Sequence, residues 1–242
     1  LGFQGPAGQP PAVPGFQLAD VSGGLYAVIG VLGALRERER TGKGSFVDVS
    51  MLESAMGFAI SGFGTLFGGV TPARGAEPLS GGIAPYRTYA TKDGKYMSLG
   101  ALEPKFWLAF CAATGLEGEM GALMPGPHQA ELQAKLEAIF RGKTRAEWEA
   151  LAAGLDVCLE PVLEPHEVPD DAHTRARGLF FDLDGPHGKT RQLRLPVTPR
   201  DKAHTPAPRQ GEHTEIVLRD AGFDDARIAA LRAEGAIPPA KP

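Results

Sequence analysis

Residues 81–107 read GGIAPYRTYATKDGKYMSLGALEPKFW and contain the signals of a hairpin followed by a helix. Two β-prone runs, 84–90 and 95–101, flank an Asp-Gly pair that supplies the turn chemistry of a hairpin. Pro104 then fits the first position of a helix, where its missing N–H costs no hydrogen bond. The stretch therefore predicts the core of a small mixed α+β unit.

Segments rich in proline and glycine mark the limits of this unit. Residues 68–82 break the periodic pattern upstream, and residues 164–183 do so downstream, as linkers between compact units do. Inside the unit, Thr144 and Glu147 form a capping box that opens a further helix. We expect a small α+β domain at 83–163, between a linker at 68–82 and a return linker at 164–183.

Residues 1–67 and 184–242 are expected to form the first and last parts of one larger domain. Helical signals occur near both ends of the chain, and this arrangement suggests a larger domain interrupted by a smaller one. The elements expected outside the small unit are a helix at 22–40, a strand at 45–50, a helix at 51–69, a hairpin at 179–196 and helices at 213–222 and 224–235.

The helix expected at 22–40 contains the most apolar run of the chain. Its apolar stripe at helical spacing consists of Leu25, Val28, Ile29, Leu32 and Leu35. The apolar run at 25–35 is too short to span a bilayer, and it continues directly into alternating arginine and glutamate, as a buried helix does when it reaches the surface. We interpret it as a core helix and expect no membrane partner.

Composition bounds the class of protein. The chain has 242 residues, of which 43% are hydrophobic and 22% charged, so it can bury a sizeable core. A formal net charge of −4 with both signs mixed argues against nucleic-acid binding. Cys111 and Cys158 lack ligand spacing, which predicts reduced thiols, a cytoplasmic location and no metal. The turn-rich start without a signal peptide suggests a beginning inside a longer protein.

Two carboxylates are candidates for chemistry. Asp20 precedes the expected helix, where unpaired N–H groups and the helix dipole favour negative charge. On local sequence alone a capping aspartate is the favoured interpretation. In the functional alternative, the amides stabilise an oxyanion while the carboxylate attacks a carbonyl or removes an α-proton. Glu103 lies at a strand-to-helix junction, where an ordinary surface glutamate is again favoured.

Three other patterns give weaker signals. The sequence DGPHGKT at 184–190 has two residues between its glycines where a phosphate loop requires four, so we interpret it as a hairpin turn. His166 and His173 lack metal-ligand spacing, which favours surface positions. Core packing and the lining of a path for a lipid tail are both open interpretations for Met51, Met56 and Met97.

Several segments together resemble the class III CoA-transferase family, and within it the 2-methylacyl-CoA racemases. The resemblance covers nearly the whole chain in order and spacing. It rests on LADVSGG (18–24), LRERERTGKGSFVDVSMLES (35–54), the stretch at 81–107, TRAEWEAL (144–151) and GEHTEIVLRDAGF (211–223).

The resemblance implies an α/β fold in which a large Rossmann-like domain carries an inserted small α+β domain. It also implies an interlocked homodimer with active sites between subunits. The N-terminal βαβ units of such an enzyme have no counterpart in this sequence. We therefore expect only the later part of the large domain, equivalent to the C-terminal two-thirds of the enzyme.

The resemblance also implies roles for individual residues. Asp20 matches the catalytic aspartate, and Glu103 matches a glutamate that racemases pair with a catalytic histidine. That histidine is expected upstream of Asp20, yet the first histidine here is His128. Residues expected to bind substrate are Gly23, Gly24, Gly81, Gly82 and Leu102.

Three functions remain open at this stage. The first is racemisation of a 2-methylacyl-CoA by proton transfer through an enolate, with a CoA thioester as substrate and no cofactor. The second is a CoA-transferase in which Asp20 acts as nucleophile. The third is an inactive CoA-binding or dimerising fragment.

Overall fold

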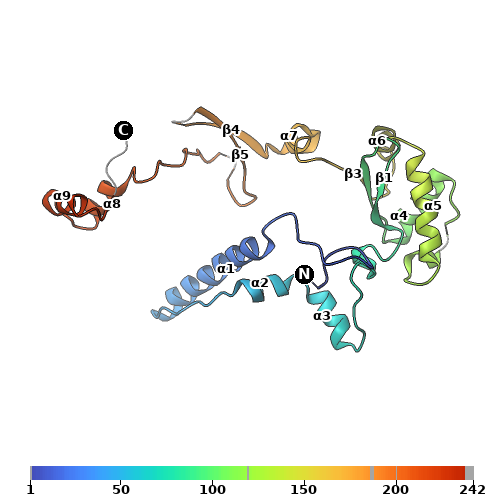
Figure 1. The fold of residues 1–242 in the computed structure, drawn as a ribbon, viewed down its shortest axis with the longest axis horizontal. Coiled ribbons are helices and arrows are strands. Elements are labelled where there is room, and N and C mark those ends of the chain that lie inside the picture. The colour runs from blue at the N-terminus through green and yellow to red at the C-terminus, as the bar shows by residue number, and fades with distance from the viewer. Residues whose placement is uncertain (1, 119, 186–187, 200, 238–242) are drawn as a thin grey trace. The chain divides into compact units, whose positions relative to one another are not determined.

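The chain forms two units, Leu1–Val162 and Leu163–Pro242, which are described separately (Figure 1). The structure is a computed structural model that describes residues 2–118, 120–185, 188–199 and 201–237. The domain boundaries predicted at 68–82 and 164–183 stay predictions.

A three-stranded antiparallel sheet is the centre of the first unit. Strands β1 (Tyr86–Ala90), β2 (Tyr96–Gly100) and β3 (Leu159–Val162) pair in that order. Gly94 in the β1–β2 turn has φ 75°, the left-handed conformation that glycine adopts without strain. The hairpin predicted from the Asp-Gly pair is therefore confirmed.

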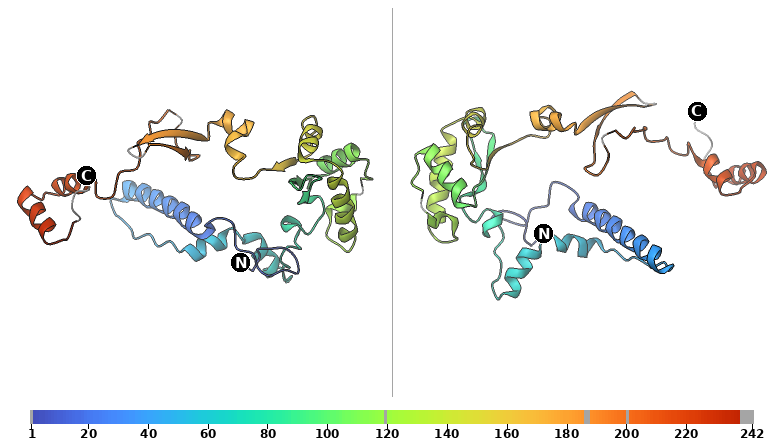
Figure 2. Two further views of the ribbon diagram at one scale, coloured as in Figure 1. Left: turned by 45° about the horizontal axis from the view of Figure 1, so that its top comes forward. Right: turned by 180° about the vertical axis from the view of Figure 1, so that it is seen from behind.

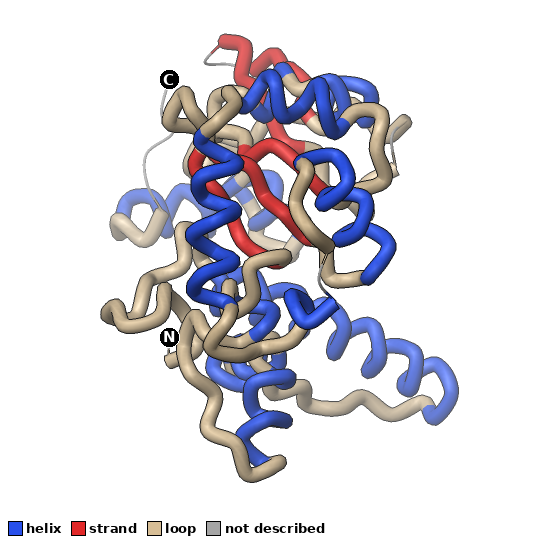
Figure 3. The backbone as a smooth tube through the Cα atoms, turned by 90° about the vertical axis from the view of Figure 1, so that its right-hand side faces the viewer, coloured by secondary structure: helices blue, strands red, loops and turns tan. Residues whose placement is uncertain are grey.

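Helices lie beside this sheet (Figure 3) and enclose an aromatic core. They are α4 (Pro104–Thr114), α5 (Gln129–Arg141) and α6 (Arg145–Ala152), with short 3₁₀ turns at Pro78–Ser80 and Met120–Leu123. The Phe140 ring lies 4.7 Å from the rings of both Tyr89 and Trp148 and 5.7 Å from that of Phe110. The predicted proline start of α4 and the capping box of α6 are both present.

The N-terminal part of the first unit differs from prediction in three places. It contains α1 (Leu18–Thr41), α2 (Met51–Gly57) and α3 (Ile60–Phe67). Helix α1 begins four residues early, so Ser22 is no cap: its hydroxyl donates to the Ala19 carbonyl, 3.1 Å away. Residues 45–50 form no strand, since no strand pairs with them in the described structure. The single helix predicted at 51–69 is interrupted at 58–59.

Helices α1 and α2 lie side by side in each view (Figure 2). Glycines permit the close approach: a Cβ on Gly23 would lie 3.2 Å from Met51 Cγ, and one on Gly30 would lie 2.7 Å from Val47 Cγ1. The apolar stripe predicted for the core is nevertheless exposed, with Ile29 at 63% and Leu35 at 47%. The core-helix prediction is therefore wrong within the described chain.

Helix α1 is also longer and more apolar than predicted. By length and composition alone, α1 is long and apolar enough to cross a membrane, because its apolar character extends beyond the run at 25–35. Core helices of soluble proteins meet the same two criteria, so this feature is weak evidence for a membrane partner.

The second unit consists of a hairpin and short helices. A 3₁₀ turn (Val168–Asp170) precedes α7 (Ala172–Arg177), β4 (Phe180–Gly185), β5 (Gly188–Leu193), α8 (Thr214–Asp220) and α9 (Asp225–Ala233). The hairpin and both C-terminal helices are confirmed predictions. Glu215 on α8 makes ion pairs with Arg219 and with Arg232 on α9, which joins the two helices. Both described sheets are antiparallel, so the Rossmann-like core stays a prediction.

Candidate active site

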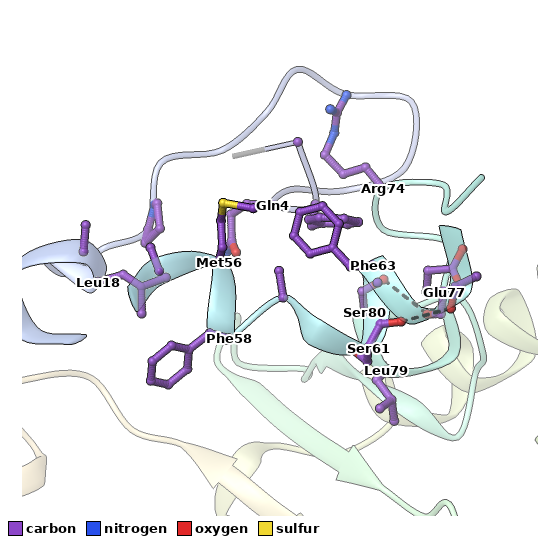
Figure 4. Close-up of a pocket in the computed structure, with 18 of the residues that line it drawn as sticks. Gln4, Leu18, Met56, Phe58, Ser61, Phe63, Arg74, Glu77, Leu79 and Ser80 are labelled. Carbon is purple, nitrogen blue, oxygen red and sulfur yellow. Dashed lines mark hydrogen bonds between the residues drawn. The ribbon is translucent and has the colours of Figure 1, made fainter. Parts of the chain in front are cut away.

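A pocket of about 840 Å³ in the first unit contains Asp20 in its lining (Figure 4). The beginning of α1 supplies Leu18, Ala19 and Asp20. The N-terminal segment, the α2–α3 region and residues 73–80 supply the other walls. All of these segments belong to one unit, so the pocket needs no placement of one unit against the other.

Asp20 is the third residue of α1, in its first turn, and its side chain is exposed. The first-turn amides of Ala19 and Asp20 have no acceptor within the helix, because a helix leaves its first N–H groups unpaired. Gln17 at the N-cap makes no side-chain hydrogen bond to them. One end of the pocket therefore combines a carboxylate with the positive end of a helix dipole.

The walls of the pocket are mainly apolar. Figure 4 shows Met56 and Phe63 from the α2–α3 region in the pocket together with Gln4. The Phe63 ring is held by Phe3, whose centroid lies 5.3 Å away in an edge-to-face arrangement, and by Phe67 at 6.1 Å. An apolar wall beside a carboxylate suits a ligand that joins a hydrocarbon part to a reactive polar group.

Polar groups occur where residues 73–80 border the pocket. The Arg74 guanidinium donates to the Gln9 carbonyl at 2.6 Å, and Figure 4 shows this side chain extending away from Glu77. One Glu77 carboxylate oxygen accepts from the Ala73 amide at 3.0 Å. The Ser80 hydroxyl donates to the Glu77 carbonyl at 3.2 Å. The bonds of Glu77 with Ala73 and Ser80 fold residues 73–80 into a compact turn.

Glu103 is exposed at the N-cap of α4 and is absent from the residues that line the Asp20 pocket. Its side chain makes no capping bond, while its carbonyl accepts from the Phe106 and Trp107 amides at 3.1 Å each. Desolvation raises the pKa of the Cys158 thiol, and the negative charge of the Glu103 carboxylate raises it further. The described residues of one chain therefore do not bring the two predicted carboxylates into one pocket.

The residues predicted to bind substrate are distributed over the first unit. Gly23 is buried against Met51, which explains its lack of a side chain by packing, whereas Gly24 faces open space. Gly81 and Gly82 line a second pocket of about 1200 Å³ next to the Asp20 pocket, and Leu79 and Ser80 line both. Leu102 is half-buried and precedes Glu103.

Several lining residues were missed in the sequence. Arg74 and Glu77 fell in a segment interpreted as a linker, and the local sequence pattern gives no signal that they line a pocket. Of the three methionines, Met97 is fully buried, so its core interpretation is confirmed. Met56 is 44% exposed and lines the pocket, which fits the alternative interpretation.

Metal ligation has no candidate among the described residues. No group of three or more histidine, cysteine, aspartate or glutamate side chains in that part of the chain could hold an ion. The groups that line the Asp20 pocket are the Asp20 and Glu77 carboxylates, the Arg74 guanidinium, the first-turn amides of α1 and apolar walls.

Comparison with known proteins places the fold. The model of CoA-transferase family III matches residues 1–214. The chain belongs to CoA-transferase family III. A family protein from Brucella suis, solved by crystallography, superposes with a TM-score of 0.70 at 26% identity, covering 90% of this chain and 59% of that one.

Relatives within CoA-transferase family III have two kinds of activity in their names. The alpha-methylacyl-CoA racemase of Mus musculus is 35% identical over 237 residues, covering 95% of this chain and 61% of that protein. The formyl-CoA:oxalate CoA-transferase of Rhodopseudomonas palustris is 28% identical over 264 residues, again covering 95% and 61%. The chain thus spans about three-fifths of the length of these relatives.

Proposed function

We propose that this chain carries part of the active site of an acyl-CoA racemase that exchanges the α-proton of a 2-methyl-branched acyl-CoA. The observation that carries the proposal is the Asp20 carboxylate, beside first-turn amides, on an apolar pocket of about 840 Å³. The 35% identity to a protein named alpha-methylacyl-CoA racemase supports it.

The chemistry of the reaction explains why these groups suit it. The α-proton of a thioester is weakly acidic, so its removal needs a base and donors aimed at the enolate oxygen that develops. Asp20 would take the proton from one face of the α-carbon, and the amides of Ala19 and Asp20 would donate to the enolate oxygen. A second base would then deliver a proton to the opposite face, so that one C–H bond breaks and another forms.

The second base is the part of the proposal that the pocket does not supply. We expect a histidine oriented by Glu103, because an imidazole near its working pKa can both accept and donate a proton. No histidine lines the Asp20 pocket among the described residues. The proposal includes no metal and no redox cofactor, since the CoA thioester itself is the substrate.

The walls of the pocket support an acyl chain as the ligand. Met56, Phe58 and Phe63 offer an apolar surface, and the flexible thioether of methionine adapts to branched hydrocarbon. Selection among acyl chains would then depend on this wall, and a 2-methyl branch would lie close to the Asp20 end. A role in cytoplasmic lipid metabolism is the corresponding cellular proposal.

We also propose that the protein acts as an interlocked homodimer with a Rossmann-like large domain. Two features of the first unit support a second copy. The apolar stripe of α1 is exposed, as an interface is before it is covered. Glu103 is separate from the Asp20 pocket of its own chain, as expected if a partner's Glu103 completes the site.

The runner-up function is CoA transfer. Here the Asp20 carboxylate would attack the acyl-CoA, form an anhydride and then an aspartyl-CoA thioester, and so relay CoA to a second carboxylic acid. The 28% identity to a formyl-CoA:oxalate CoA-transferase favours this alternative. A third possibility, a CoA-binding or dimerising chain without turnover, is favoured by the absence of a histidine from the described pocket lining.

One experiment separates the three functions. The chain is incubated in deuterated water with a chiral 2-methylacyl-CoA and a free carboxylic acid, alone and with the part of the mouse relative that the match leaves out. α-Deuteration with retention of the acyl-CoA supports the racemase. A CoA adduct on Asp20 together with new acyl-CoA would overturn the racemase and support the CoA-transferase. Binding of the acyl-CoA without either reaction would support a chain that binds CoA but has no turnover.

A further inference from the structure

The loop that precedes β1 is held by a buried amide side chain. Gln129, the first residue of α5, is 4% exposed. Its Oε1 accepts from the Ala84 amide at 2.7 Å, and its Nε2 donates to the Ala122 and Met124 carbonyls at 2.8 and 2.7 Å. Burial of an amide is unfavourable unless its polar atoms are paired, and here the pairing joins segments far apart in the sequence.

A second side chain holds the same loop residue from the sheet. The Tyr89 hydroxyl on β1 donates to the Ala84 carbonyl at 2.7 Å, and the Tyr89 ring is almost fully buried. Both backbone polar groups of Ala84 are thus bound by side chains, one from α5 and one from β1. Since hydrogen bonds fix both position and direction, the two together leave Ala84 little freedom.

The residues just before Ala84 are fixed by close backbone packing. The Gly82 amide donates to the Glu77 carbonyl at 2.9 Å. A Cβ on Gly82 would lie only 2.0 Å from the Ala76 carbonyl oxygen, so only glycine fits there. Gly81 has φ 96°, in the left-handed region that favours glycine. Residues 76–84 therefore contain a turn, 77–82, whose two ends are joined by a hydrogen bond, and end at Ala84, which α5 and β1 hold.

This turn forms part of the boundary that the two pockets of the first unit share, together with Phe3 and Gln4, which also line both. Leu79 and Ser80 line both pockets, whereas Gly81 and Gly82 line the second one only. Because Leu79 and Ser80 line both pockets, a shift of the turn would change the shape of both. The position of Ala84 therefore bears on the shape of the site, although Gln129 and Tyr89 line neither pocket.

We propose that Gln129 and Tyr89 are positioning residues that hold residues 76–84 as a fixed wall between the two pockets. They act through Ala84 and not on a ligand. The inference rests on the proposed function only for its kinetic consequence: a fixed wall holds the acyl-CoA in place beside Asp20. Its structural content is tested without turnover.

The structural test is amide hydrogen exchange on the full chain. Gln129→Met nearly keeps the side-chain volume and removes the hydrogen bonds of the amide, among them the one to Ala84, so amides of residues 80–84 should exchange about tenfold faster or more. Ala138→Met places the same side chain on the exposed face of α5 and should leave them unchanged. Unchanged exchange at 80–84 in a folded Gln129→Met protein would overturn the proposal.

A second variant covers the case in which Gln129→Met does not fold. Tyr89→Phe removes only the hydroxyl bond to Ala84 and keeps the aromatic stack with Phe140. It should accelerate exchange at 80–84 by about threefold to tenfold without changing exchange in α6. Equal acceleration throughout the unit, or none at 80–84, would count against a local positioning role.

The kinetic test uses the same variants in the assay for α-deuteration. Loss of a fixed wall should raise KM for the acyl-CoA about threefold or more while kcat stays within about twofold. Loss of folded protein alone would lower the apparent kcat at unchanged KM, and that result would refute the positioning role. If the unaltered protein shows no turnover, the proposed function fails. The hydrogen-exchange result still decides whether Gln129 and Tyr89 hold residues 76–84 in place.

Discussion

Replacement of Phe140 by alanine tests the aromatic core of the first unit. Phe140 is fully buried; its ring stacks with Tyr89 at 4.7 Å and Phe110 at 5.7 Å and lies tilted against Trp148 at 4.7 Å. Truncation of a buried phenylalanine costs about 3–5 kcal/mol, and three lost aromatic pairs place this site near the upper end of that range. Domain stabilities are about 5–15 kcal/mol, so the loss is a large fraction of the total.

Urea unfolding followed by tryptophan fluorescence measures this loss. Both tryptophans of the chain, Trp107 and Trp148, are fully buried in the same core, so the signal reports on it specifically. With a urea slope of about 2 kcal/mol per molar, the midpoint of Phe140→Ala should fall by about 2 M. Phe46→Ala, at a ring that is 92% exposed, should shift it by less than about 0.3 M. Equal shifts in the two variants would refute the assigned core.

Two further predictions concern backbone space and electrostatics. Gly82→Ala should destabilise the first unit by about 1–3 kcal/mol, because the added Cβ would collide with the Ala76 carbonyl oxygen. Gly33→Ala, in open space on α1, should instead stabilise it by up to about 1 kcal/mol. Thermal unfolding measures both changes. Glu103→Gln removes a charge that raises the pKa of Cys158, so the thiolate fraction at pH 8 increases and iodoacetamide should alkylate Cys158 faster. Glu117→Gln is the control, and an equal rate in both variants would contradict the assigned proximity.

The elements that local chemistry determines were predictable from the sequence. The β1–β2 hairpin follows from an Asp-Gly turn, α4 from the proline at its first position, and α6 from the capping box of Thr144 and Glu147. Each signal acts within a few residues, so no knowledge of distant contacts is needed. The glycine stops of α1 and α8 are predictable for the same reason.

The failures occur where distant segments decide the outcome. Residues 45–50 have strand-like composition, but a strand needs a neighbour to pair with, and none lies beside them in the described chain. The start of α1 moved to Leu18 because leucine and alanine extend a helix well, which local capping rules at Ser22 do not take into account. The apolar side chains of α1 are exposed because the described chain packs no other segment against them, which the spacing of apolar residues within a helix does not indicate.

In the candidate site, too, a residue with a local signal was predictable and residues that depend on distant contacts were not. Asp20 was identified as a candidate from its position near a helix start and from the family resemblance, and the structure adds that it lines an apolar pocket. The contribution of Arg74 and Glu77 depends on how residues 73–80 fold back, which composition alone does not give. The role of Glu103 stays a prediction, because Glu103 does not line the Asp20 pocket of the described chain.

The role of Asp20 as the base is measured by the rate of α-deuteration of a 2-methylacyl-CoA in Asp20→Asn. Asparagine keeps the shape of the side chain and removes its basicity, so the rate should fall by at least about 100-fold relative to the unaltered protein. Asp48→Asn, at an exposed carboxylate outside the pocket, should stay within about twofold of the unaltered rate. Deuteration that persists in Asp20→Asn at the unaltered rate would contradict Asp20 as the base.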